Sequence, residues 1–183
     1  GALVGVTGSE SIVTSSADTR VTMGNGVTIR SHQLSGSDEV SGNDVTISAT
    51  NLASASNNTN AFAFGTAALG VHVTRTTQTG DAVVSTGDSF TLNSKRNASL
   101  TASTDRDTRT VSVAGAGGAI AATGGEAITK HVSNAMVRIG DGTSASNGAD
   151  IDASDNLTVT AQNTDTYDGS IDAGAVALAG VTG

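Results

Sequence analysis

One strand-like segment occurs three times in this chain of 183 residues. The segment DNLTVTAQN, residues 155–163, alternates small or apolar residues with polar ones. A period of two residues is typical of a strand with one buried face. NDVTISATN, residues 43–51, has the same layout, and RNASLTAST, residues 96–104, has nearly the same layout. This repetition predicts a fold built from equivalent strands.

Aligning the three segments on their polar leading residues places apolar residues at shared positions. Ile47, Leu100 and Val159 then align. The alternation predicts that these three side chains point into the core. The residues predicted to face outward beside them are Thr46, Thr101 and Thr160.

Two further patterns recur in a fixed order. In an apolar, glycine-rich pattern, the aligned residues are Leu3, Leu69, Ile120 and Leu178, and their spacing varies from one pair to the next. In a turn pattern, a glycine precedes an Asx residue, which favours a tight turn with positive φ. Its members are Gly24-Asn25, Gly87-Asp88 and Gly140-Asp141.

The ordered patterns define a degenerate repeat with units of roughly 50–66 residues. We place the units at 1–66, 67–117 and 118–175, with the start of a fourth at 176–183. No spacing is constant, so we expect loops to absorb the insertions.

The repeat predicts an all-β chain, a parallel β-helix (β-solenoid) that forms one segment over residues 1–183. Helix signals are poor, and the aromatic and histidine signatures of a propeller, the alternative architecture, are missing. The chain has no proline, which suits uninterrupted strand ladders, and only four aromatic residues, which suits a thin core of small side chains. By the usual size of solenoid coils, each unit is expected to hold about two to four coils.

Composition excludes several classes of function. The formal net charge is −8 and there is no basic stripe, so nucleic acid is not an expected partner. There is no cysteine for a disulfide or a thiolate site. The apolar runs 111–122 and 173–181 are too short and too rich in glycine to span a membrane. The opening residues show no signal-peptide pattern.

Several motifs suggest a binding or catalytic site and have a simpler structural interpretation. The three histidines, His32, His72 and His131, lack metal-ligand spacing and are predicted on the surface. The acidic turns 35–44 and 148–156 could hold Ca²⁺, although the nonapeptide of calcium-binding β-rolls is absent, so solvated turns are predicted.

Three further motifs are also predicted to be structural. GDGTSA, residues 140–145, fits a dinucleotide fingerprint formally, but no helix is predicted after it. TDRDTR, residues 104–109, offers the Asp and Arg residues of a lyase groove, yet Asp105, Asp107 and Arg109 share one strand face. Paired threonines, as at Thr158 and Thr160, could form an ice-binding array, but they do not share one coil position. The sequence therefore predicts no catalytic, cofactor-binding or metal-binding residues, and no enzyme.

The chain resembles a known family in the pattern V-x-I-G-D-G (137–142), a polar turn, N-L-T-V-T-A (156–161) and GAVALAGVTG (174–183). This pattern is similar to the repeats of very large bacterial filamentous adhesins, including filamentous haemagglutinin-like and leukotoxin-type surface proteins. The resemblance implies a parallel β-helical stalk and a surface location, and it implies no catalytic residue.

We therefore expect a structural segment of an extracellular stalk or filament that serves adhesion, biofilm or surface assembly. Expected partners are neighbouring repeats or copies of the chain stacked along the axis, and host or matrix glycans or proteins. The alternative is a carbohydrate-active or glycan-binding β-helix of the polysaccharide lyase or phage tail-fibre type.

Overall fold

A computed structural model describes residues 3–35, 38–140 and 148–182, apart from the side chains of 32–42 and 179–182. The described residues form strands without any helix, so the chain is all-β. Within these ranges, no helix has the length and hydropathy needed to cross a bilayer. The strands are β1 (Val4–Ser16), β2 (Thr19–Met23), β3 (Thr28–Arg30), β4 (His32–Ser35), β5 (Asp38–Gly42), β6 (Val45–Phe64), β7 (Ala67–Thr79), β8 (Ala82–Thr86), β9 (Thr91–Ser94), β10 (Ala98–Val132), β11 (Ala135–Arg138), β12 (Asp150–Ala153) and β13 (Leu157–Thr182).

Strands equivalent in sequence lie side by side and pair in parallel. β6 pairs with the first part of β10, which pairs on its other side with β13. β1, β7 and the last part of β10 form a second such series. The short strands β2, β8 and β11 pair in this way, as do β3, β9 and β12. We call one passage of the chain through these four positions a winding.

The register confirms the alignment of the first pattern. Leu100 pairs with Ile47 on one side and with Val159 on the other. The two pairings have different offsets along the chain, and two inserts explain why. The offset falls from 63 to 53 residues across the antiparallel hairpin β4–β5. It then rises to 59 residues between β11 and β12.

Two details of the sequence alignment are wrong. Each repeat makes one winding, and not two to four coils, because its long strands fill the space that several short ones would need. In the glycine-rich pattern, Leu69 pairs with Val6 and Ala122, whereas the alignment matched it with Leu3 and Ile120. Small apolar residues at adjacent positions gave several near-equal alignments, and the backbone ladder selects one of them.

The turn pattern is confirmed in position but not wholly in conformation. Gly87 donates its N–H to the Met23 carbonyl at 2.8 Å, so the turns of successive windings lie together. Gly140 has the expected positive φ of 68°. In the other two turns the positive φ falls two residues after the aligned glycine, on Gly26 at 69° and on Ser89 at 55°.

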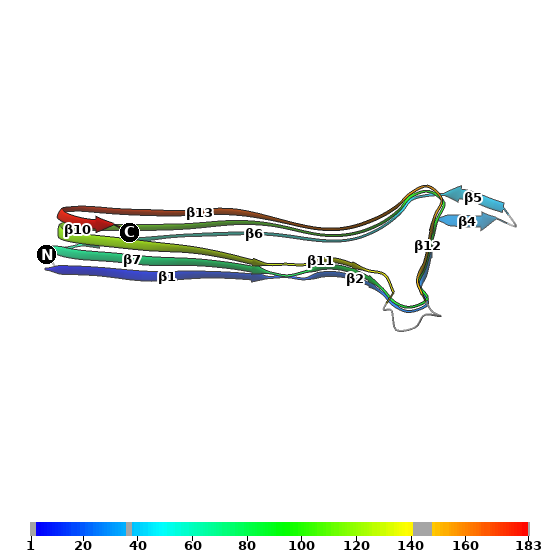
Figure 1. The fold of residues 1–183 in the computed structure, drawn as a ribbon, viewed down its shortest axis with the longest axis horizontal. Coiled ribbons are helices and arrows are strands. Elements are labelled where there is room, and N and C mark those ends of the chain that lie inside the picture. Colours follow the sequence, from blue (N-terminus) through cyan, green and yellow to red (C-terminus); the bar gives the residue numbers. More distant parts are fainter. Residues whose placement is uncertain (1–2, 36–37, 141–147, 183) are drawn as a thin grey trace.

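The windings are long and narrow, with a wide end and an arm (Figure 1). The arm contains β1, β6, β7, β10 and most of β13, and its layers meet where β10 and β13 reverse direction at the arm tip. The wide end contains β2, β3, β8, β9, β11 and β12, and the β4–β5 hairpin projects from it. A 20-residue strand such as β6 makes the arm about 65 Å long.

Apolar residues gather at both ends of the winding. The larger cluster fills the wide end around Phe90, Leu92 and Leu100, none of which is exposed. A smaller cluster of alanines lies at the arm tip, around Ala63 and Ala116. Glycines let the two layers of the arm approach there, since a Cβ on Gly70 would lie 2.8 Å from the Gly115 carbonyl oxygen.

The prediction that Val159 is buried is wrong. Ile47 and Leu100 are buried as predicted, but Val159 is 48% exposed and Leu157 is 49% exposed. β13 is paired with β10 in the predicted register, so its inward residues do face the same side. They remain exposed because β13 is at the edge of its sheet and, among the described residues, no strand pairs with it on the side away from β10.

Asx side chains link the corners of successive windings. Asp18 Oδ1 accepts the Asp81 N–H at 2.9 Å, and Asp81 Oδ1 accepts the Asn134 N–H at 3.1 Å. At a second corner Asp44 Oδ1 accepts the Asn97 N–H at 3.1 Å, and Asn156 Nδ2 donates to Asn97 Oδ1 at 2.9 Å. In both corner ladders the earlier winding supplies the acceptor and the later winding supplies the donor.

These hydrogen bonds lower the pKa of two corner carboxyls. The Asp81 backbone N–H, followed by the Arg20 side chain, lowers the pKa of Asp18. The backbone N–H of Asn97, followed by its side-chain amide, lowers the pKa of Asp44. A hydrogen bond to a carboxylate favours its charged form, which is the cause of both shifts.

Leucine-to-alanine substitutions test the unequal burial of the windings. We expect Leu100→Ala to lower the free energy of unfolding by about 2–5 kcal/mol, because it empties a buried site. Leu157→Ala, on the half-exposed face of β13, should cost at most about 1 kcal/mol. Urea denaturation measures both values. Equal costs would mean that the inner face of β13 is covered.

The corner carboxyls predict a loss of stability in acid. A carboxyl whose pKa is lowered by folding stabilises the fold above its unfolded pKa, about 3.9, and this contribution is lost as the pH falls through the folded pKa. The melting temperature of the double variant Asp18→Asn, Asp44→Asn should therefore fall less than that of the wild type between about pH 5 and pH 2. The control is Asp105→Asn, Asp107→Asn, which removes the same charge on an exposed face. A wild-type-like acid profile for the corner variant would contradict the prediction.

Candidate functional site: the arm interior and a groove at the arm tip

The centre of the arm is polar, between the two apolar clusters. Its buried inward residues make hydrogen bonds between the layers, as where Thr110 Oγ1 donates to Thr76 Oγ1 at 2.9 Å. Asn57 Nδ2 donates to the Arg75 carbonyl at 3.0 Å. The buried polar residues there are Asn51, Asn57, His72, Thr74, Thr76, Gln78, Thr104, Arg106, Thr108, Thr110 and Ser112. The sequence predicts a thin core of small side chains, so the polar centre of the arm differs from that prediction.

Two histidines lie inside the arm, so their predicted surface position is wrong. His72 is fully buried, with Ser9 Oγ 2.6 Å from Nδ1 and Thr74 Oγ1 3.0 Å from Nε2. The side chain of His131 is 1% exposed and stacks on Tyr167 with a centroid distance of 4.3 Å. The side chain of His32 lies outside the described part of the structure.

His131 joins a hydroxyl and a carboxylate in the arrangement that hydrolases use. Its Nε2 is 2.5 Å from Thr108 Oγ1, and its Nδ1 is 3.2 Å from Asp165 Oδ1. A nucleophile must reach its substrate, however, and Thr108 is fully buried. In this structure the group forms a hydrogen-bonded bridge between the layers.

Arg106 is a buried cation in the same region. The TDRDTR motif places it inward, while Asp105, Asp107 and Arg109 face outward as predicted. Its Nη2 donates to the Gly80 carbonyl at 2.6 Å. Asp165 is the ladder neighbour of Arg106 on β13, and its carboxylate contacts His131. Among the described residues, Arg106 Nε and Nη1 are buried without a hydrogen-bond partner.

The other predicted motifs do not assemble into a site. Of the acidic turns, Asp150 and Asp152 lie on β12, and most of the side chains of 35–44 lie outside the described part. Most of the 140–145 motif is also outside it. Among the residues that are described, no group of three or more His, Asp or Glu residues could hold a metal ion.

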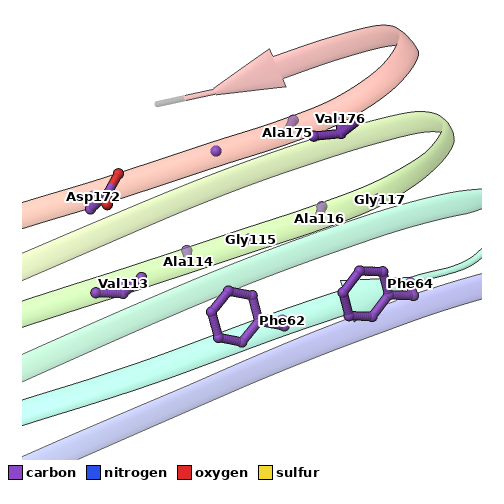
Figure 2. A pocket seen from close by; sticks show the side chains of 11 residues that line it. Phe62, Phe64, Val113, Ala114, Gly115, Ala116, Gly117, Asp172, Ala175 and Val176 are labelled. Atoms are coloured by element: carbon purple, nitrogen blue, oxygen red, sulfur yellow. The ribbon is translucent and has the colours of Figure 1, made fainter.

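A groove lies on the surface of the arm tip (Figure 2). Its volume is about 360 Å³, and it is bounded by the rings of Phe62 and Phe64. Its other lining residues come from β10 and β13: Val113, Ala114, Gly115, Ala116, Gly117, Asp172, Gly174, Ala175 and Val176. A smaller groove of about 250 Å³ is lined by residues of β1, β7 and β10, among them Val6, Leu69 and Ile120.

The register explains how the larger groove forms. Phe62 pairs with Gly115 and Phe64 pairs with Gly117, on the outward face of the arm. A Cβ on Gly115 would lie 2.5 Å from the Phe62 ring, so the ring lies over the glycine. The rings remain 54% and 73% exposed. This groove was not predicted from the sequence. The available signal was a pair of phenylalanines at alternate positions, with a pair of glycines at the equivalent positions one repeat later.

Comparison of the chain with protein-family models, with curated proteins and with solved structures gives no match. The geometry alone therefore carries the functional argument. It offers a buried polar interior and a mainly apolar groove whose lining includes Asp172.

Proposed function

We propose that the chain is a structural segment of an extracellular β-solenoid, used as a stalk or filament in adhesion, biofilm or surface assembly. The observation that carries this proposal is the parallel pairing of the long strands β1, β6, β7 and β10 with the equivalent strand one winding later. Such a ladder runs along the axis of a solenoid, so the chain extends by stacking windings, each adding about 4.8 Å.

The shape of the winding supports a surface role. Each winding uses 53 to 63 residues for one step along the axis, because most of them form the arm. The arm then projects sideways by about 65 Å and offers two broad faces. We infer that the wide end forms the backbone of the stalk and that the arm presents surface to the surroundings. The resemblance to filamentous adhesins favours a bacterial cell surface.

The groove favours a second candidate function, glycan binding. Aromatic rings that remain exposed are a surface on which a sugar can stack, and Asp172, on β13 across the groove from Phe62 and Phe64, supplies a carboxylate. The lining is otherwise apolar, which gives a sugar few hydrogen-bond partners. We therefore retain the structural role as the main proposal.

In-phase duplication tests the solenoid. Repeating residues 53–105 in tandem adds one winding of the length that separates β6 from β10, so the inward and outward faces are kept and a new interface between windings forms. The melting temperature should rise by about 5 °C or more. Repeating residues 53–104 instead shifts the register by one residue and exchanges the two faces. If both duplications fold equally well, as judged by cooperative melting and circular dichroism, the ladder is not the organising feature.

A glycan array distinguishes the two functions. We expect the wild-type chain to bind no glycan above the level of the double variant Phe62→Ala, Phe64→Ala. Leu52→Ala, which removes another exposed apolar side chain from β6, is the matched control. A glycan bound by the wild type and by Leu52→Ala, but not by the double variant, would establish the groove as a sugar site.

A further inference from the structure

We propose that the open face of β13 binds a second copy of this chain, head to tail, in one register. Residues 45–64 of the second copy lie on residues 157–176 of the first. This inference rests on the proposed solenoid and names its partner.

The described strands leave matching edges at the two ends of the stack. β6 and the portion of β13 at residues 157–176 each pair with β10 alone. β1, β2 and β3 have partners on one side only, and so do β11 and β12. Parallel ladder edges of this kind accept a further strand.

In this register, residues near the beginning and near the end of the described ladder occupy equivalent positions. Val4 pairs with Ala67, Ala67 with Ile120, and Ile120 with Ala179, so Val4 and Ala179 occupy equivalent positions. The four residues that follow are identical, Gly-Val-Thr-Gly, at 5–8 and 180–183. In the stack, residues 4–7 of the second copy and residues 179–182 of the first would take the same place beside β10. Because the two segments are alike, either one can pair there, and the second copy's strand continues along β10 from Gly8.

Inward side chains match in this register. The second copy's Val45 and Ile47 would follow Leu157 and Val159 in the core columns, and its Asn51 would follow Asn163. Its β1 and β2 would lie opposite β13 and cover Leu157 and Val159, just as Val21 and Met23 pack against the core within one copy. The second copy would therefore bury the residues that one copy leaves half-exposed.

Outward groups largely agree as well. The second copy's Arg30 would lie beside Asp152, while its Glu10 would lie beside Glu126, a like-charged pair on an exposed face. Its Phe62 and Phe64 would follow Gly174 and Val176. The groove of Figure 2 would then have phenylalanines on both sides, so the second copy completes it.

The corner ladders give the stack its direction. In each ladder the earlier winding accepts a hydrogen bond from the later one. Asn134 and Asn156 end these series, and their side-chain oxygens are the equivalent acceptors for the backbone N–H groups of Asp18 and Asp44 in the next copy. A head-to-head pair would bring acceptors against acceptors, so head-to-tail stacking is favoured.

Engineered cysteines test the register, because the chain has none of its own. Thr46→Cys, Thr158→Cys places the two thiols on neighbouring strands only between copies, since within one chain they lie about 10 Å apart. On oxidation at high concentration we expect covalent oligomers. Ser48→Cys, Thr158→Cys is the matched control, offset by two residues to about 8 Å, and should give about tenfold less covalent oligomer.

A third variant separates the two proposals. Thr46→Cys, Ser99→Cys joins directly paired residues within one chain and should form an intramolecular disulfide if the solenoid is correct. Failure of this bond overturns the solenoid, and stacking with it. If the bond forms, a monomer at all concentrations in sedimentation velocity overturns stacking alone. Equal crosslinking of Thr46→Cys, Thr158→Cys and of Ser48→Cys, Thr158→Cys would also overturn stacking in this register. Efficient crosslinking of the single variant Thr158→Cys would do the same.

Discussion

The fold depends on a parallel ladder in which each strand pairs with its equivalent one winding later. Pairing of this kind satisfies the backbone only if successive windings keep the same register, and the side-chain period of two then keeps each face constant. The inserts show how strict this constraint is. The β4–β5 hairpin and the segment between β11 and β12 change the spacing along the chain, yet the ladder resumes in register after each of them.

The kind of side chain in the interior differs between the wide end and the arm. Large apolar side chains, among them Phe90, Leu92 and Leu100, fill the wide end. Along the arm the layers are close, and small or polar side chains fit between them. Threonine, asparagine and histidine bridge the layers with hydrogen bonds, as between Thr108 and His131. Such contacts hold the arm flat and hold the layers in one relative position, because each donor needs its own acceptor.

The surface has a different character from the interior. It carries ion pairs that are well exposed, such as Arg109 with Asp168 at 3.3 Å, and these contribute little to stability. Many of its exposed apolar residues lie at the arm tip, where Phe62 and Phe64 lie over glycines. An apolar surface beside open strand edges favours protein contacts over chemistry. The proposed structural role and the proposed stacking of copies both rest on this combination.

The sequence by itself determined the strand content, the parallel repeat, and the register of Ile47, Leu100 and Val159, because a half-buried strand requires strict alternation and equivalent strands repeat it. It also predicted correctly that Asp105, Asp107 and Arg109 share an outward face. Tertiary structure alone decided that a repeat makes one long winding, that His72 and His131 are inside, and that Val159 is left half-exposed. The groove, too, required the fold, since Phe62 meets Gly115 only when strands one winding apart become neighbours. These features depend on what lies opposite a strand, and alternation reports only which side of the strand a residue faces.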